Sequence, residues 1–238
     1  MPEVPAALNL LLRAAPAARR SKSGGRLKHV AFAAGTQFWQ EGEALTHVLF
    51  PVRGILSLQM PAGPGKRVEV GLVGTEGIAG ISLLLGEPKA RMSVVALTDG
   101  EAVLMPRKVF QSCLDSPGFR AAVNQYLRFF ILMLAKLSAC HRAHVVESLC
   151  AGRLLLMQDR TRSDSFQVTQ DFLSRLLGVR RATVSRAASQ LQKGGSIRYD
   201  RRGRLKILDR GRLEKAACSC YRAIKADFDR LVKAQGGW

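Results

Sequence analysis

Acidic residues are scarce in this sequence relative to basic ones. The 238 residues include 37 Lys and Arg but only 18 Asp and Glu, which gives a formal net charge of +19. From residue 150 to the end we count 20 basic and 8 acidic residues, so 20 minus 8 leaves +12 on this part of the chain. Grouped cations favour a polyanionic partner, because contact with a phosphate backbone releases counterions. A generally basic protein and a membrane-surface patch are the alternatives.

Long apolar segments are lacking as well. The longest strongly apolar run, residues 129–135, is closed by Arg128 and Lys136, and it is far shorter than the roughly 20 residues that span a bilayer. A short apolar run at residues 6–12 is followed, not preceded, by its arginines, which is the reverse of the order in a secretory signal peptide. A cytoplasmic protein without a membrane partner is therefore expected.

Cysteines are few, odd in number and scattered. A small secreted domain held by disulfides would show a paired framework, so we expect a reducing compartment. The five positions are Cys113, Cys140, Cys150, Cys218 and Cys220.

Soft metal ligands occur in two places, and neither predicts a metal site or a cofactor. Cys140, His141 and His144 fall within one helical turn, but no spaced partner pair accompanies them. Cys218 and Cys220 are two positions apart, and alternate residues of a helix do not face one another. Packing of a C-terminal helix is thus favoured over a thiol switch at this pair.

Glycines and short apolar stretches alternate in the first half of the chain. After a short helical lead at residues 4–15 and a polar segment at residues 19–25, apolar runs such as 47–50, 55–58 and 94–97 are separated by glycines. This spacing is typical of short strands joined by tight turns. It therefore predicts a compact all-β unit over residues 26–108. Residues 61–65 (PAGPG) are the clearest hairpin end, because Pro and Gly supply the two turn dihedrals.

Residues 119–148 contain no Pro or Gly, which predicts one long helix. Large residues recur along it every three or four positions, as expected where helices pack together. We expect the apolar surface of this helix to pack against the β unit and against a second copy of the chain. An internal core helix of a monomer is the alternative. Gly152 is expected to end the helix, with shorter helices at residues 153–159, 170–177 and 181–193. The stripe comprises Val123, Leu127, Phe130, Leu134, Leu137 and His141.

Residues 168–186 (VTQDFLSRLLGVRRATVSR) have the pattern of a helix-turn-helix. Thr169 is placed to cap a first helix, Gly178 to form the tight turn, and Val179 and Val184 to fill the space between the helices. The expected buried face of the first helix is Phe172, Leu173, Leu176 and Leu177, and that of the second is Ala187, Ala188 and Leu191.

The second helix of this motif leaves four residues facing outward near its start: Arg181, Ala182, Ser185 and Arg186. A recognition helix meets base edges there, and Arg can donate twice to the O6 and N7 acceptors of one guanine. Two alternating strands at residues 196–208, around Arg201, Arg202 and Gly203, predict a β-hairpin wing. Its cations are expected on phosphates, where they set register rather than sequence. A surface helix with solvated arginines is the alternative.

These features together resemble the Crp/Fnr family of bacterial transcription regulators over nearly the whole chain. The most specific segments are residues 177–186 (LGVRRATVSR) and 205–210 (LKILDR), and residues 217–221 (ACSCY) resemble one branch of the family. The resemblance implies an α+β fold. Its parts are an N-terminal lead (1–25), a jelly-roll-like β-roll sensor domain (26–116), a long dimerisation helix (117–150) and a C-terminal winged helix-turn-helix (151–238).

The resemblance also implies a homodimer on a two-fold symmetric DNA site, with RNA polymerase as a further partner. Arg181 and Arg186 match the arginines that commonly contact bases, and Thr169 lies near a phosphate-contacting position. Ala182 departs from the acidic residue often found between them, which puts the usual half-site in doubt because Ala cannot accept from cytosine N4. The expected DNA-binding residues are Thr169, Gln170, Arg180, Arg181, Thr183, Ser185, Arg186, Arg202 and Arg204.

The expected effector-binding residues are Gly80, Arg91, Ser93 and Ser138. Cyclic-nucleotide-binding relatives carry a Gly-Glu pair followed about ten residues later by Arg-Ser, whereas this chain has Gly80-Ile81 and Arg91-Met92-Ser93. Ile81 cannot accept from a ribose hydroxyl, which forfeits roughly 1.5 to 3 kcal/mol. The family's oxygen sensors hold an iron–sulfur cluster on thiolates mostly near the N-terminus, and no cysteine precedes Cys113 here.

The signal is therefore left open between an unknown small molecule and none at all, with a cyclic nucleotide as the alternative ligand. Two functions of other kinds are also weighed. An enzyme using Cys140, His141 and His144 would need a further ligand or carboxylate and an open pocket, so no enzymatic activity is expected. An architectural nucleic-acid binder would show salt-sensitive affinity without a preferred sequence.

Overall fold

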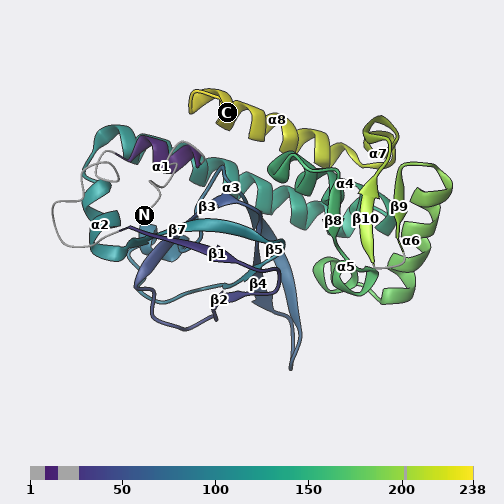
Figure 1. The fold of residues 1–238 in the computed structure, drawn as a ribbon, viewed down its shortest axis with the longest axis horizontal. Helices are drawn as coiled ribbons and strands as arrows, with labels where there is room; N and C mark the ends of the chain where they lie inside the picture. Colours follow the sequence, from purple (N-terminus) through teal and green to yellow (C-terminus); the bar gives the residue numbers. More distant parts are fainter. Residues whose placement is uncertain (1–8, 16–26, 201–202, 238) are drawn as a thin grey trace. The chain divides into compact units, whose positions relative to one another are not determined.

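The computed structural model describes residues 9–15, 27–200 and 203–237 (Figure 1). The chain divides into two compact units. One holds the described residues up to Gln59, Leu72–Ile131 and those from Phe228 onward; the other holds Met60–Gly71 and Leu132–Asp227. No helix within the described residues is long and apolar enough to cross a membrane.

The first part of the chain forms two antiparallel sheets, as the glycine-punctuated sequence predicts. One sheet has the order β1 (Lys28–Phe32), β7 (Gly100–Pro106), β3 (His47–Arg53). The other has the order β2 (Gln37–Trp39), β6 (Ser93–Ala96), β4 (Leu56–Pro61), β5 (Arg67–Val73). The hairpin predicted at residues 61–65 joins β4 to β5, and the Ala62 N–H donates to the Lys66 carbonyl at 2.9 Å.

Short helical segments accompany these sheets. Helix α1 (Leu10–Ala14) is capped by Asn9, whose side chain accepts from the N–H groups of Leu11 and Leu12; the rest of the predicted lead lies outside the described residues. A 3-10 helix, η3 (Ile81–Leu85), and helix α2 (Arg107–Cys113) follow. The core contains the ring of Phe110, whose centroid lies 6.3 Å from that of Phe50 and 6.0 Å from that of Phe119.

The long helix is shorter than expected and does not end where expected. Helix α3 spans Pro117–Ala143 and helix α4 spans Val146–Thr161, so the prediction of a helix continuous over residues 119–148 and broken at Gly152 is wrong. Gly152 lies inside α4, and a Cβ atom on it would stand 3.6 Å from the Cβ atom of Tyr221, which is ordinary van der Waals contact. A helical glycine costs about 1 kcal/mol, but one glycine within sixteen helical residues does not end this helix.

The apolar stripe on α3 is largely an internal face. Its members Val123, Phe130 and Leu137 are buried, whereas His141 is exposed. Two other apolar residues of α3 point to solvent: Ile131 is 62% exposed and Leu132 is 42% exposed. One face of the helix is thus used within the chain, and another carries unburied apolar surface.

The C-terminal part has the predicted winged helix-turn-helix architecture. Helices α5 (Gln170–Leu177) and α6 (Arg181–Lys193) begin and end at the predicted residues. The wing strands β9 (Ile197–Tyr199) and β10 (Arg204–Ile207) pair antiparallel. A third strand, β8 (Ser165–Gln167), pairs with β10 and was not predicted. Helices α7 (Arg210–Ala216) and α8 (Ser219–Ala234) follow.

Candidate DNA-binding interface

Local hydrogen bonds fix both ends of α5 as the sequence predicts. The Thr169 hydroxyl accepts from the Phe172 N–H at 3.1 Å, which satisfies a free donor at the start of the helix. Gly178 adopts φ of +64° at the C-terminal end, and the Val179 N–H donates to the Ser174 carbonyl at 3.1 Å. This left-handed conformation is available to Gly without strain, so the chain turns directly into α6.

Helix α6 has one buried face and one exposed face. Val184 is fully buried and packs below the helix together with Ala187, Ala188 and Leu191. The four residues predicted to face outward, Arg181, Ala182, Ser185 and Arg186, are all exposed. Phe172 of α5, expected in the buried face, is only half-buried. The exposed surface at the start of α6 therefore consists of two arginines, a serine and a methyl group.

The three-stranded wing presents further cations beside the motif. Arg198 and Lys206 are direct cross-strand partners, and both are exposed, as is Arg204. Like charges opposite one another destabilise a strand pair. A bound polyanion would relieve this repulsion, so the arrangement favours the anion-bound protein over the free protein. Gly203, at φ +74°, brings the wing turn against α5: a Cβ atom on it would lie 3.4 Å from Thr169 Cγ2. Arg202 lies outside the described residues.

The electrostatics of this surface are one-sided. Residues 178–206 contain nine Lys and Arg but a single acidic residue, Asp200. Within the described part of the chain, neither Arg181 nor Arg186 is held in an ion pair, and no side chain caps the start of α6. Uncapped N–H groups at a helix N-terminus bind anions. Both the arginines and the helix start are thus available to an anionic ligand.

The remaining predicted DNA-binding residues surround this surface. Arg180 is exposed and precedes α6 with extended backbone, while Gln170 and Thr183 are half-buried. The described members of the predicted set thus lie on α5, on α6 and at the wing. Their individual roles in DNA binding stay predictions.

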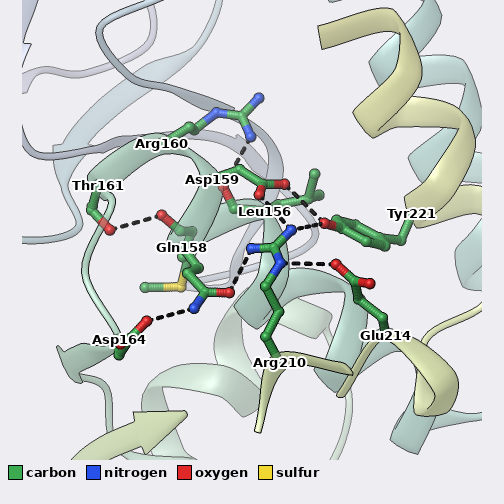
Figure 2. Close-up of polar contacts among 10 residues, drawn as sticks. Leu156, Gln158, Asp159, Arg160, Thr161, Asp164, Arg210, Glu214 and Tyr221 are labelled. Carbon is green, nitrogen blue, oxygen red and sulfur yellow. Dashed lines mark hydrogen bonds and ion pairs between the residues drawn. The ribbon is translucent and has the colours of Figure 1, made fainter. Parts of the chain in front are cut away.

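A polar network behind the motif, which the sequence did not predict, joins α4, α7 and α8 (Figure 2). The Arg210 guanidinium donates to Asp159 at 2.8 Å, to Gln158 at 2.6 Å and to the Tyr221 hydroxyl at 2.6 Å. Its Nε also donates to Glu214 at 2.8 Å.

Burial and the charges within this network shift the pKa values of Arg210 and Tyr221. The Asp159 side chain is only 5% exposed. Burial raises the pKa of Tyr221, and the Asp159 carboxylate raises it further. For Arg210 burial opposes the charged form, but Asp159, Tyr221 and Glu214 together outweigh burial and raise the pKa. The charged Arg210 side chain therefore links α4, α7 and α8, the helices next to the helix-turn-helix motif.

The candidate effector residues do not form a comparable site. A cavity lined by Gly80, Ile81 and Arg91 has a volume of only about 10 Å³, about enough for one water molecule. Arg91 is ion-paired with Glu87, and its hydrogen bond holds the pKa of that carboxyl below its usual value. Ser93 is buried and accepts from the Glu41 N–H at 3.1 Å. The fourth expected residue, exposed Ser138, lies on α3 in the other compact unit.

Fold and surface together define a winged helix-turn-helix protein with a β-roll domain. The family model of the Crp-like helix-turn-helix domain matches residues 150–216. That of the cyclic nucleotide-binding domain matches residues 29–116. The chain belongs to the Crp/Fnr family of transcription regulators, whose members bind DNA and act as dimers.

Solved structures of known regulators have the same fold. A CRP-family transcriptional regulator from Thermus thermophilus has a TM-score of 0.68 at 18% identity, with 79% of this chain and 96% of that chain covered. A CRP/FNR-family regulator from the same organism has a TM-score of 0.64 at 20% identity, with 80% and 98% covered. FixK2 from Bradyrhizobium japonicum has a TM-score of 0.57 at 18% identity, with 81% and 98% covered. No curated protein sequence matches the chain.

Proposed function

We propose that this regulator binds a two-fold symmetric DNA site as a homodimer and reads bases with Arg181 and Arg186. The observation that carries the proposal is the exposed, uncapped start of α6, where both arginines are free of ion pairs within the described residues. A guanidinium fork matches the O6 and N7 acceptors of guanine in the major groove. The wing cations Arg204 and Lys206 would contact phosphates, which position the protein without reading sequence.

The residue between the two arginines affects which half-site is preferred. Ala182 is exposed but offers only a methyl group. A methyl group can contact the thymine methyl, whereas a carboxylate at this position would accept from cytosine N4. We therefore expect the half-site to differ from that of relatives with an acidic residue here, at the base pair that Ala182 faces.

Dimerisation through α3 is supported by the apolar surface that the helix exposes. Ile131 and Leu132 are adjacent, and both project to solvent. Arg128 and Ala135 are also exposed and lie three or four positions away, so the exposed face follows the helical repeat. Two copies packed along this face would present two recognition helices, whose spacing must match the groove repeat of about 34 Å.

The signal that acts on the β-roll is proposed to be either a ligand other than a cyclic nucleotide or none. The cavity of about 10 Å³ beside Gly80 and the outward ion pair of Arg91 support this. Cyclic nucleotide binding is the alternative that the domain's family match favours. RNA polymerase is proposed as a further partner, since regulation of transcription ends at that enzyme. The cytoplasm is the proposed location, and no enzymatic activity is proposed.

The decisive experiment is selection of bound duplexes from a random DNA pool, followed by affinity measurements at fixed salt. We expect a palindromic motif with two half-sites. Arg181→Ala and Arg186→Ala should each relax base preference at one position of each half-site, by about 1 to 3 kcal/mol per contact. Arg204→Ala is the matched control, because removing a phosphate contact weakens binding to all sequences equally. A selection without a motif, or equal losses from all three variants, would contradict base reading.

A further inference from the structure

Four side chains of metal-ligand type meet in the second compact unit, although the sequence separates them into two distant pairs. Cys140 lies in the last turn of α3 and His144 just after it. Cys218 lies between α7 and α8, and Cys220 lies in the first turn of α8. The Sγ atoms of Cys140 and Cys218 are 3.2 Å apart, and Cys220 Sγ lies 3.8 Å from His144 Nδ1. All four ligand atoms lie within 4.8 Å of one another.

These distances bracket the separations that a single tetrahedral ion requires. Zinc–thiolate bonds of about 2.3 Å at tetrahedral angles place two sulfur atoms about 3.8 Å apart, and zinc–imidazole bonds of about 2.0 Å bring nitrogen and sulfur slightly closer. An iron–sulfur cluster would hold its thiolates further apart, because several metal–sulfide bonds lie between them. The set of three sulfur donors and one nitrogen donor is a composition found in structural zinc sites.

We propose that Cys140, His144, Cys218 and Cys220 bind one Zn²⁺ ion as a closed structural site. Four protein ligands complete a tetrahedron and leave no position for water or substrate, so the site stabilises and does not catalyse. Binding transfers one proton from each of the three thiols to the solvent. Three thiolates and Zn²⁺ carry a net charge of −1, which is offset by the basic excess of the C-terminal part of the chain.

The surroundings of the four ligands suit such a site. Cys140 is buried, and the other three are half-buried. The adjoining cavity of about 20 Å³ is lined mainly by apolar groups such as Leu137, Leu156 and Ile224, which exclude water from metal–ligand bonds. The cysteines are not joined to one another as disulfides.

The rule that argued against convergence of Cys218 and Cys220 does not apply to this pair. Alternate residues of a helix do not face one another, but α8 begins at Ser219, so only Cys220 is helical. Cys218 precedes the helix with non-helical backbone, and its side chain can share a direction with that of Cys220. The other two ligands are more than 70 residues away in sequence, a distance at which no spacing rule operates.

The proposal predicts a cross-link between the end of α3 and the start of α8. Metal binding that exists only in the folded state adds its free energy to folding. The inference is independent of the DNA contacts proposed above, since none of the four ligands belongs to α5, α6 or the wing. A zinc-free protein that still selects a palindromic DNA would refute only the metal site.

The test uses the full-length protein, purified from cells grown with zinc and freed of any histidine tag. Elemental analysis is expected to find about one zinc per chain. Replacement by Co²⁺ should give thiolate-to-cobalt charge-transfer bands and the intense visible absorption of tetrahedral cobalt. Cys218→Ser with Cys220→Ser, and separately His144→Ala, should reduce the zinc content at least about tenfold, in line with the loss of ligands from a closed site.

Matched controls are Cys113→Ser and His47→Ala, which change the same residue types in the other compact unit and should retain zinc. The wild-type metal content and cobalt spectrum need no variant, so the proposal can fail even if a cysteine variant does not fold. Less than about a tenth of an equivalent of zinc together with an octahedral cobalt spectrum would overturn it. Zinc retained by the double cysteine variant would overturn it as well, as would a Cys140–Cys218 disulfide in protein kept under reducing conditions.

Discussion

The start of α6 and the β-roll cavity are both candidate ligand sites: the first is a candidate contact for DNA and the second for an effector. They are built in opposite ways. At α6, Arg181 and Arg186 are exposed and lack ion pairs within the described residues. In the β-roll, Arg91 is paired with Glu87, and the cavity beside Gly80 has room for about one water molecule.

This difference shows that the start of α6 is accessible to its ligand in this conformation, whereas the β-roll cavity is not. Exposed cations beside uncapped helix N–H groups can bind an anion without first breaking an internal ion pair. Arg91 has to exchange its surface partner Glu87, and the small cavity beside Gly80 has to widen, before a phosphate can bind there. The match to the cyclic nucleotide-binding domain therefore describes the fold of the β-roll, and its ligand has to be determined separately.

The largest effect is expected from Ile131→Asp on α3. If this 62% exposed side chain packs against a second copy, a carboxylate there would be buried without a partner and would cost several kcal/mol. Dimer formation should weaken by at least about 100-fold, and with it binding to a palindromic site. Sedimentation and DNA titration measure the two losses.

Leu85→Asp is the matched control for this change, because Leu85 is 74% exposed and lies in the β-roll. It should leave dimerisation and DNA binding unaltered. A dimer that survives Ile131→Asp would move the proposed interface away from this face of α3.

A smaller effect is expected from Arg210→Met, which removes the cation that joins α4, α7 and α8 (Figure 2). Asp159 would remain buried without its partner. Loss of a fully buried pair costs about 3 to 5 kcal/mol, but Arg210 is 36% exposed, so we expect a decrease of about 2 kcal/mol in the free energy of unfolding.

Urea unfolding followed by circular dichroism measures this decrease. Arg204→Met in the wing, which removes an exposed cation of the same size, should change stability by less than about 0.5 kcal/mol. Equal effects of the two substitutions would show that the network adds nothing to the stability of the winged part.

A third prediction concerns salt. Arg204→Ala should weaken DNA binding only a few-fold, but it should reduce the slope of log K against log salt by about 0.9 for each phosphate that is no longer neutralised. Arg91→Ala in the β-roll should leave that slope unchanged. Fluorescence anisotropy over a salt series distinguishes the two. A reduced slope for Arg91→Ala would place the β-roll cation on DNA.

Predictability from the sequence follows the range of the interactions. Thr169 and Gly178 act on residues within four positions, so the ends of α5 and the start of α6 were predicted correctly. The break after α3 falls at His144 and Val145, where the sequence has neither Pro nor Gly, so no local pattern marks it and it was predicted wrongly. The third wing strand, β8, was missed because three residues carry almost no pattern until β10 pairs with them.

The candidate sites divide in the same way. The helical repeat alone places Arg181 and Arg186 on the surface, and the structure agrees. Convergence of Cys140 and His144 with Cys218 and Cys220 depends on the tertiary fold. In the β-roll the sequence showed that Ile81 lacks a carboxylate, but only the structure shows that Glu87 pairs with Arg91 and that the cavity is small.

The smallest effect is expected from cyclic AMP. A ligand that binds the folded state stabilises it by RT ln(1 + [L]/Kd), which is about 2.7 kcal/mol at a hundred times Kd. Because the cavity beside Gly80 holds about 10 Å³, millimolar cyclic AMP should shift the melting temperature by less than about 1 °C.

Ile81→Glu separates the missing carboxylate from the missing space. It restores an acceptor for a ribose hydroxyl but leaves the cavity small and Arg91 paired with Glu87. If space and pairing decide the outcome, this variant should bind cyclic AMP no better than the wild type in calorimetric titration. If it acquires micromolar affinity, the small cavity widens readily, and the missing carboxylate at residue 81 alone explains why the β-roll is less prepared for a ligand than the exposed start of α6.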